Sequence, residues 1–399
     1  MQKTKVLATI LTLCMIFTLL PGSAFAASTG TITVGGGIEI NYSIDDKGAV
    51  TIKPTAVQLE KLLETISASG EVSVTVSDIE GMTAAIIELD PAKLTASDKL
   101  TVFKLSALGT GISLPADALA SMQKQAATLR FGLAPGSMIF ELNDAGGKTV
   151  NWNDYKNSIT VSISRALPMD ISTHQIVMTR ADGSVVPRSW YSDGMVRARI
   201  NASGTYGTAV KSLGSFADTA GLWMNEAVGY MAAREIVNGV SANHFDTQGV
   251  ITRAHFVTML MRALDLELDY EEAMPPEDFA DAPEWAKKSI RMAPALGIDL
   301  IDENGNFSPN DPITRQDMFY MAYQAMDACG MVPTVFTLEW IIFPDWEGNV
   351  KGEYTNAIQN LCKMGLVSGN DDGTLNPNGS STRAEGAQFL YNILKYDAK

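Results

Sequence analysis

The chain of 399 residues has few of the side chains that enzymes use for chemistry. It has three histidines, His174, His244 and His255. It also lacks a His-Glu-x-x-His zinc motif, a Gly-x-Ser-x-Gly nucleophile motif, a phosphate loop and a dinucleotide fingerprint. We therefore predict that it is not an enzyme and binds no cofactor. A glycosidase-like acid pair stays open because carboxylates are plentiful, although the first half offers only Trp152 and Trp190 as tryptophan platforms for a sugar.

Positively charged residues and cysteines are also few. The 30 Lys and Arg are outnumbered by 45 Asp and Glu, which gives a formal net charge of −15. Nucleic acid and anionic membranes repel a chain of this sign, so neither is predicted as a partner. Cys14 lies near the N-terminus, whereas Cys329 and Cys362 lie on predicted helices. These two could pair in an oxidising compartment or serve as separate core residues, and the sequence leaves both open.

Long apolar runs are absent after the first residues. Lys3 and Lys5 precede an apolar run over 6–20, then Pro21-Gly22 and Ala24-Phe25-Ala26. This order predicts a secretory signal peptide over residues 1–26. The run is too short to span a bilayer comfortably and no later stretch is longer, so no membrane insertion is expected. The last four residues carry no sorting segment, and we expect a secreted protein held by non-covalent contacts.

Residues 27–212 have the sequence pattern of antiparallel β-sheets. Short runs alternate apolar and polar residues between Gly, Asp and Asn. They cover 31–34, 72–76, 85–89, 100–105, 159–163 and 196–200. Two helical stretches, 55–68 and 116–127, interrupt them. We predict a β-rich (α+β) surface or stalk region.

One 26-residue frame occurs three times in the second half. Each copy has a Thr-Arg step 25 residues after an aliphatic residue, at Arg253, Arg315 and Arg383. Each copy opens with an aromatic residue and an acid, at Phe216-x-Asp218, Phe279-x-Asp281 and Phe343-x-Asp345. A unit this small has too little core to fold alone, so the copies should pack together. The predicted limits are 213–270, 271–335 and 336–399.

Each copy of the frame has the pattern helix, loop, helix. Trp223 to Val237 places apolar residues at three- and four-residue spacing, and the counterpart helices begin near Trp285 and Tyr354. The second helix begins at the Thr-Arg step. The predicted fold is therefore multidomain: the β-rich region followed by an all-α, threefold-like bundle of three repeats.

The three copies resemble the S-layer homology domain from about Leu213 to the C-terminus. They share its Phe-x-Asp opening, Trp-led helix, Gly/Asp loop and Thr-Arg-Ala-Glu motif, which is intact at Thr382–Glu385. The resemblance implies a protein of the bacterial cell wall or S-layer whose three-pronged helical bundle binds secondary cell-wall polysaccharide linked to peptidoglycan. It often does so through a pyruvate ketal on an amino sugar. The glycan-binding residues that it implies are Arg253, Arg315, Arg383, Asp218, Asp281, Asp345, Trp223, Trp285, Gly239 and Gly369.

The Thr-Arg motif admits two interpretations. Thr382 and Glu385 predict a capping box, which is purely structural. Capping has no use for the arginine that follows, and the helix dipole mildly disfavours a cation there. An arginine beside free helix-start amides suits a carboxylate instead, and we favour this ligand-binding interpretation.

The copies depart unevenly from the family pattern. His255 and Asp317 replace the capping Glu, Ile301 stands opposite Gly239 and Gly369, and the third copy has Tyr354 where the helix-leading Trp belongs. One pocket is expected to be weaker than the others, and the sequence does not say which. The stretch 302–306 resembles a calcium loop, but Ile313 stands where a bidentate Glu is required, so no metal site is predicted.

The predicted function is non-covalent anchoring of a secreted protein to wall glycan. One alternative is an anchored polysaccharide hydrolase with its active module in residues 27–212. The other is a scaffold whose first half captures an unknown surface partner.

Overall fold

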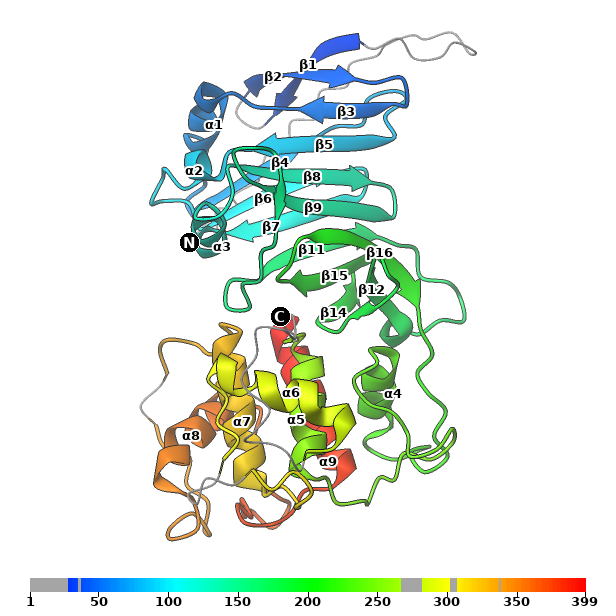
Figure 1. The fold of residues 1–399 in the computed structure, drawn as a ribbon, viewed down its shortest axis with the longest axis vertical. Coiled ribbons are helices and arrows are strands. Elements are labelled where there is room, and N and C mark those ends of the chain that lie inside the picture. The colour runs from blue at the N-terminus through cyan, green and yellow to red at the C-terminus, as the bar shows by residue number, and fades with distance from the viewer. Residues whose placement is uncertain (1–27, 35–36, 267–281, 302–306, 337–338) are drawn as a thin grey trace, which may run out of the picture. The chain divides into compact units, whose positions relative to one another are not determined.

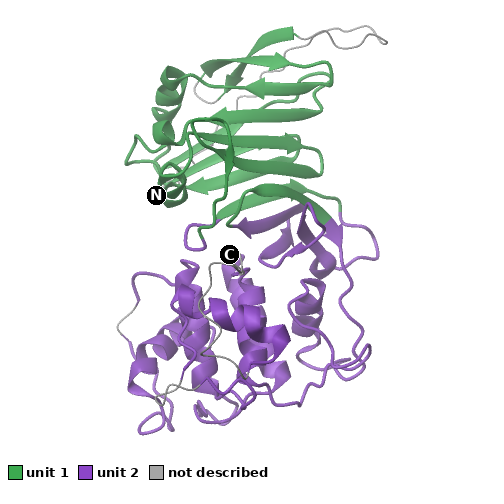
Figure 2. Cartoon of the chain, viewed as in Figure 1, with its two compact units in different colours: residues 1–154, 159–166, 201–208 green, residues 155–158, 167–200, 209–399 purple. Residues whose placement is uncertain are grey.

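A computed structural model describes residues 28–34, 37–266, 282–301, 307–336 and 339–399 (Figure 1). The predicted signal peptide, Asp281 and the stretch 302–306 lie outside the described residues. The chain forms two compact units that interleave in sequence (Figure 2). Unit 1 comprises 1–154, 159–166 and 201–208, and unit 2 comprises 155–158, 167–200 and 209–399. The domain limits given above stay predictions.

Unit 1 is built from strands and three short helices. Of the two sheets, the strands that belong to unit 1 follow the order β1-β2-β3-β5-β8-β9-β16, with β10 on β9, in one and β11-β7-β6-β4 in the other. The strands are β1 (Ser28–Val34), β2 (Ile38–Ile44), β3 (Ala49–Ile52), β4 (Glu71–Thr75), β5 (Ala84–Leu89), β6 (Val102–Ala107), β7 (Thr110–Pro115), β8 (Thr128–Ala134), β9 (Ser137–Asn143), β10 (Thr149–Val150), β11 (Ile159–Ser164) and β16 (Gly204–Val210). The helices are α1 (Ala56–Leu63), α2 (Pro91–Leu94) and α3 (Ala116–Met122).

Period-two patterning explains these strands. Residues of β2 alternate strictly between buried and exposed, because neighbouring side chains of a strand point to opposite faces. Both sheets contribute apolar side chains to a core that α1 closes with Leu59 and Leu62. Deeper in the unit, Phe140 stacks on Phe131 and meets the edge of Trp152. The alternating apolar residues of the strands therefore form a core between the two sheets.

Unit 2 combines a strand segment with the helices of the three copies. The strand segment (residues 167–200) holds the 3-10 helix η2 (Thr173–Gln175) and β12 (Ile176–Arg180), β13 (Val185–Val186), β14 (Ser189–Ser192) and β15 (Met195–Ile200). The helices are α4 (Asn225–Ala233), α5 (Arg253–Ala263), α6 (Lys287–Met292), α7 (Arg315–Ala328), α8 (Thr355–Lys363) and α9 (Arg383–Asp397), with 3-10 turns η5 (Glu284–Ala286), η6 (Pro294–Leu296) and η7 (Gly352–Tyr354).

The prediction of an all-α, threefold-like bundle is wrong. The unit that holds the copies also contains the four strands β12–β15. The extended residues beside each Thr-Arg step form β-bridges between copies, at Val250 with Thr382, Thr252 with Pro312, and Thr314 with Ser380. A helical period in the sequence reveals helices, but it carries no signal for isolated bridges or for strands of the preceding region joining the same compact unit as the copies.

Backbone hydrogen bonds join the copies at the residue before each capping threonine. Ile251 N donates to the Ser381 carbonyl at 2.9 Å, Ile313 N to the Ile251 carbonyl at 3.1 Å, and Ser381 N to the Ile313 carbonyl at 3.4 Å. Each copy thus satisfies buried polar groups of another, as buried backbone requires. Cys329 and Cys362 are buried free thiols in this core, and burial raises the pKa of Cys329 to about 12.

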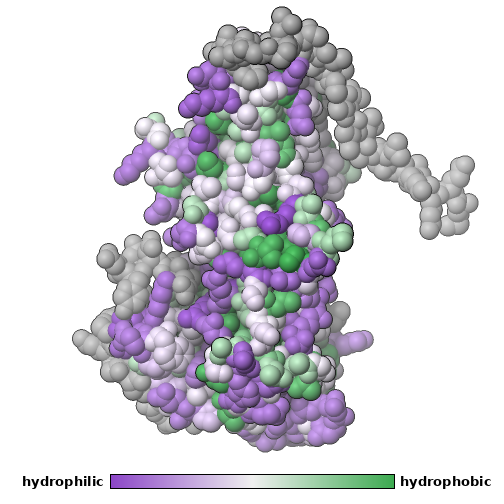
Figure 3. All heavy atoms as spheres, turned by 90° about the vertical axis from the view of Figure 1, so that its right-hand side faces the viewer, coloured by the Kyte–Doolittle hydropathy of each residue, from purple (hydrophilic) through white to green (hydrophobic). Residues whose placement is uncertain are grey.

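The described surface is mixed in character. On the face drawn in Figure 3, hydrophobic residues lie in small groups among hydrophilic ones. The described helices are all too short or too polar to cross a bilayer.

Candidate functional site

Arg253, Arg315 and Arg383 are the first residues of α5, α7 and α9. Each helix begins there because the preceding threonine caps it: the hydroxyls of Thr252, Thr314 and Thr382 accept the amides of His255, Asp317 and Glu385. In the third copy Glu385 Oε2 also accepts the Thr382 amide at 2.7 Å, which confirms the predicted capping box.

The expectation of free helix-start amides is wrong. The amides of Arg253, Arg315 and Arg383 donate to the carbonyls of Asp311, Gly379 and Gly249 at 3.0, 2.9 and 2.8 Å. The amides that follow donate to carbonyls of Pro309, Pro377 and Thr247. These partners lie in another copy, which is why the pattern within one copy did not reveal them. A ligand must therefore use the guanidinium groups.

Each guanidinium reaches the next copy, and the third returns to the first. Nε of Arg253, Arg315 and Arg383 donates to the carbonyls of Phe307, Leu375 and Phe245 at 2.7, 3.0 and 3.0 Å. The side chain that faces each arginine is the third helical residue of the next copy, namely Asp317, Glu385 or His255. The three facing side chains differ in length and charge, so the surroundings of the three arginines differ as well.

The Arg253 cluster is closed. Arg253 donates from Nη1 to Asp317 at 3.0 Å and from Nη2 to the Leu300 carbonyl at 2.6 Å. Asp317 also accepts from Tyr354 Oη at 3.0 Å and lies 3.3 Å from Lys351 Nζ. Every nitrogen of Arg253 has a partner, so this arginine has little left to offer a ligand.

The Arg315 pocket is open. It is a cavity of about 170 Å³ to which each copy contributes a predicted site residue: Trp223 from the first, Arg315 from the second and Gly369 from the third. Arg315 Nη1 lies 3.9 Å from Glu385 Oε1, too far for a hydrogen bond. Burial lowers the pKa of Arg315, while the charges of Glu385 and Asp345 oppose that shift. The described residues thus leave both Nη atoms available to a ligand.

Trp223 and Gly369 complete this pocket in different ways. Trp223 is 62% exposed, which leaves an aromatic face for contact. Gly369 has φ +78°, and a Cβ there would come within 2.6 Å of the Phe343 ring and 2.9 Å of the Thr374 carbonyl. Only glycine lets this loop approach so closely. In the first copy a Cβ at Gly239 would likewise lie 2.5 Å from Phe216.

The Arg383 cluster has a histidine where the other two have an acid. Arg383 donates from Nη2 to the Asn238 carbonyl at 2.9 Å. The His255 ring stacks on Trp285 with 4.7 Å between centroids, and Trp285 is 48% exposed. Burial and the Arg383 charge lower the pKa of His255. Among the three positions this is the one without a carboxylate on the facing helix.

The opening aspartates hold loops. Asp218 accepts the amides of Phe245, Asp246 and Thr247 at 2.8, 2.7 and 3.1 Å. Asp345 accepts those of Leu375 and Asn376 at 2.9 and 2.7 Å. Burial opposes ionisation, but these amide bonds still lower the pKa of Asp218. The aspartates fix the loops whose carbonyls the arginines bind.

Comparison with known proteins agrees with this architecture. The family model of the S-layer homology domain matches residues 215–257, 278–319 and 342–387. The chain carries three S-layer homology domains. These domains anchor surface proteins, and they indicate a secreted protein associated with the bacterial cell wall.

Similar proteins include both enzymes and S-layer proteins. An amylopullulanase of Thermoanaerobacterium thermosulfurigenes is 30% identical over 45% of this chain and 10% of its own length. Exoglucanase XynX of Acetivibrio thermocellus is 29% identical over 45% of this chain and 16% of its own. An S-layer protein of Bacillus licheniformis is 29% identical over 44% of this chain and 19% of its own. The chain thus spans less than a fifth of each relative's length, and with the hydrolases it shares only the S-layer homology region.

Proposed function

We propose that this chain attaches to the wall by binding secondary cell-wall polysaccharide linked to peptidoglycan, and that an acidic substituent of the glycan enters the Arg315 pocket. The ligand that fits is a pyruvate ketal on an amino sugar. The observation that carries the proposal is the cavity itself, where the partly buried Arg315 keeps free donors beside an exposed tryptophan.

The chemistry of the pocket suits a carboxylate on a sugar. The two Nη atoms of Arg315 form a planar fork that matches the two oxygens of a carboxylate. Trp223 offers a flat apolar face to the ring, and Glu385 is exposed enough to accept from a hydroxyl or amide of the sugar. The cavity of about 170 Å³ is smaller than pockets for drug-sized ligands, roughly 300–1,000 Å³, and suits one substituted sugar of a longer chain.

The Arg383 cluster is proposed as a secondary position, because Arg383, His255 and Trp285 offer a cation and a stacked aromatic surface with no carboxylate on the facing helix α5. The Arg253 cluster is not proposed as a binding position, because Asp317 already occupies its arginine.

The test compares native walls with walls from which ketal-linked pyruvate has been removed by mild acid. Binding of the protein should fall on the treated walls, and Arg315→Lys should weaken binding to native walls because Lys keeps the charge without the fork. Arg130→Lys in unit 1, where Arg130 pairs with Glu141, is the matched control. Undiminished binding to treated walls would reject the pyruvate ketal as the ligand.

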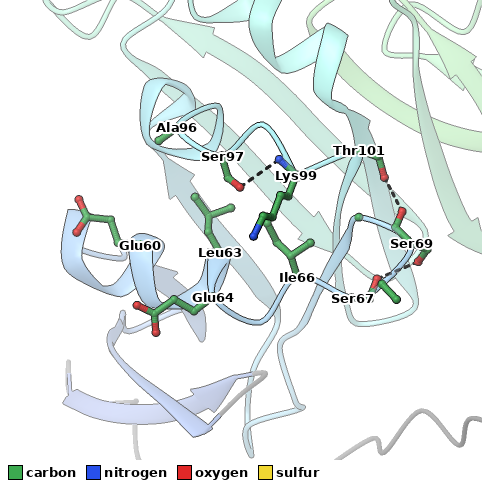
Figure 4. A pocket seen from close by; sticks show the side chains of 12 residues that line it. Glu60, Leu63, Glu64, Ile66, Ser67, Ser69, Ala96, Ser97, Lys99 and Thr101 are labelled. Carbon is green, nitrogen blue, oxygen red and sulfur yellow. Dashed lines mark hydrogen bonds between the residues drawn. The ribbon is translucent and has the colours of Figure 1, made fainter.

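We propose no catalytic role for residues 27–212. A cavity of about 810 Å³ in unit 1 lies between α1 and the segment 96–101 (Figure 4). Its described lining includes Glu60, Glu64 and Lys99 but no aromatic residue. Both glutamates are exposed, Glu60 on α1 and Glu64 directly after it. This favours a surface or stalk role, and assays of the intact protein on wall glycans for released sugars test it.

A further inference from the structure

The strand segment is fastened to the first S-layer homology domain by a buried arginine. The Ser189 carbonyl accepts from Tyr230 Oη at 3.0 Å and from Arg234 Nε and Nη2 at 3.0 and 2.7 Å. Arg234 Nη1 also donates to the His174 carbonyl at 3.0 Å. Tyr230 lies on α4 and Arg234 caps its C-terminal end. The orientation of α4 is therefore tied to β14 and η2.

The same segment is fastened to the third domain by a buried ion pair. Arg188 donates from Nε and Nη2 to the two carboxylate oxygens of Asp397 at 2.7 and 2.9 Å. Their side chains are only 2% and 7% exposed. Asp397 is the last residue of α9. A two-point bond of this kind fixes direction as well as distance, so the strand segment also sets the position of α9.

Helix α9 forms one side of the Arg315 pocket, and the residue that leads into α4 contributes to another. Trp223 lies just before α4, and Glu385, Gln388, Phe389 and Asn392 line the pocket from α9. The two helices touch each other through the hydroxyl of Tyr391 and the carboxylate of Glu226. His174 of the strand segment meets the ring edges of Tyr230 and Tyr391 at 5.4 and 6.3 Å. Neighbouring residues 188 and 189 thus hold α9, which lines the pocket, and α4, which follows the lining residue Trp223.

We propose that the strand segment positions the Arg315 pocket: Arg188 and the Ser189 carbonyl set the spacing of α9 and α4, and with it the distance between Glu385 and Trp223 that the glycan requires. This rests on the proposed function. Arg188, Arg234 and Tyr230 are positioning residues. The Arg383 cluster depends on the segment less, because hydrogen bonds of its own tie Arg383 to Gly249, Phe245 and Asn238.

The experiment is a double-mutant cycle in the full chain, read as wall affinity well below the melting temperature. Arg188→Lys keeps the charge opposite Asp397 but loses the two-point bond. It should weaken binding about fivefold, a coupling of the size expected within one network. In an Arg315→Ala background it should cause no further loss, whereas in an Arg383→Ala background the loss should persist. Arg130→Lys is the control for the substitution itself.

Melting curves separate positioning from simple stability. Tyr230→Phe removes one hydroxyl from the Ser189 carbonyl and serves as the second variant if Arg188→Lys does not fold. Equal losses in both arginine backgrounds, or lowered melting with unchanged affinity, would overturn the inference. If Arg315→Ala weakens binding and neither strand-segment variant does, this inference fails and the proposed function stands. If Arg315→Ala itself binds normally, both fail.

Discussion

Arg253 and Arg315 occupy the same motif in neighbouring domains, yet one is locked and the other is available. Both follow a capping threonine and donate Nε to a carbonyl of the next domain. The difference comes from the acid across from them. Asp317 is not held by its capping threonine's amide and bonds Arg253, whereas the Thr382 amide retains Glu385 and leaves it 3.9 Å from Arg315. The acid that faces the arginine is Asp317 in the closed Arg253 cluster. At the open Arg315 pocket it is Glu385, whose side chain is one methylene longer.

The aromatic residues sharpen this contrast. Tyr354 stands where the other domains have a tryptophan, and its hydroxyl bonds Asp317 and completes the closed cluster. Trp223 cannot make that bond from its apolar face, and the corresponding space is a cavity. Repetition of a motif in sequence therefore does not imply repetition of a binding site.

The largest expected effect comes from breaking the closed cluster. Asp317→Ala leaves the buried Arg253 without its counter-charge, and loss of one partner of a buried pair costs about 3–5 kcal/mol. Glu385→Ala, at the open pocket, should cost only about 1 kcal/mol because it removes part of a cap. Urea unfolding of both variants measures the difference. If both variants lost the same unfolding free energy, the Arg253 cluster and the Arg315 pocket would not differ as described.

The capping threonines give a smaller, more selective effect. Thr314→Ala and Thr382→Ala should each lower stability by about 1 kcal/mol. Only Thr382→Ala should also weaken wall binding, because it removes the hydroxyl that donates to Glu385 Oε2 at 3.1 Å and so loosens the carboxylate nearest Arg315. Thermal melting and wall sedimentation on the same samples check both parts. Loss of binding in Thr314→Ala, or none in Thr382→Ala, would contradict this account of why the pocket is open.

Ser381 should tolerate loss of its hydroxyl. It is fully buried where the other domains have Ile251 and Ile313, and its Oγ has no hydrogen-bond partner among the described residues. Ser381→Ala removes an unsatisfied group and should leave stability unchanged or raise it by up to about 1 kcal/mol. Ser380→Ala, one residue earlier and exposed, is the control. A clear loss of stability in Ser381→Ala would mean that the hydroxyl has a partner.

The Arg383 cluster should respond to pH. The pKa of His255 is lowered in the folded state by burial and by Arg383, so the unfolded chain binds the proton more readily. The stability that His255 contributes is full above its ordinary pKa of about 6.5 and is lost as the pH falls from there through the lowered value. His255→Gln should flatten the curve of unfolding free energy against pH in that window. If the unfolding free energy of His255→Gln depended on pH as that of the unmodified protein does, His255 would not be the group responsible.

Much of the local structure could be predicted from the sequence. The contacts between domains that assemble the site could not. Strands form at all six alternating runs, and the Thr382–Glu385 box is present, because these depend on neighbours in sequence. The partners of Arg253, Arg315 and Arg383 could not be predicted, because each lies in another domain. The attachment of Arg188 to Asp397 spans more than 200 residues and has no local signal. The sequence did hint that the three positions differ. The fourth residue of the motif is His255, Asp317 or Glu385, and it is the only motif position whose charge changes between the copies.

The most direct test compares the wall affinity of Arg315→Ala with that of Arg253→Ala, each measured on protein shown to be folded at the assay temperature. A lost charge-assisted hydrogen bond is worth roughly 1.5–3 kcal/mol, so Arg315→Ala should lower affinity about ten- to a hundredfold. Arg253→Ala should melt at a lower temperature but bind walls as the unmodified protein does while it remains folded. Wild-type affinity in Arg315→Ala, or an equal loss in folded Arg253→Ala, would contradict the claim that one motif of the pair binds glycan and the other only holds the fold.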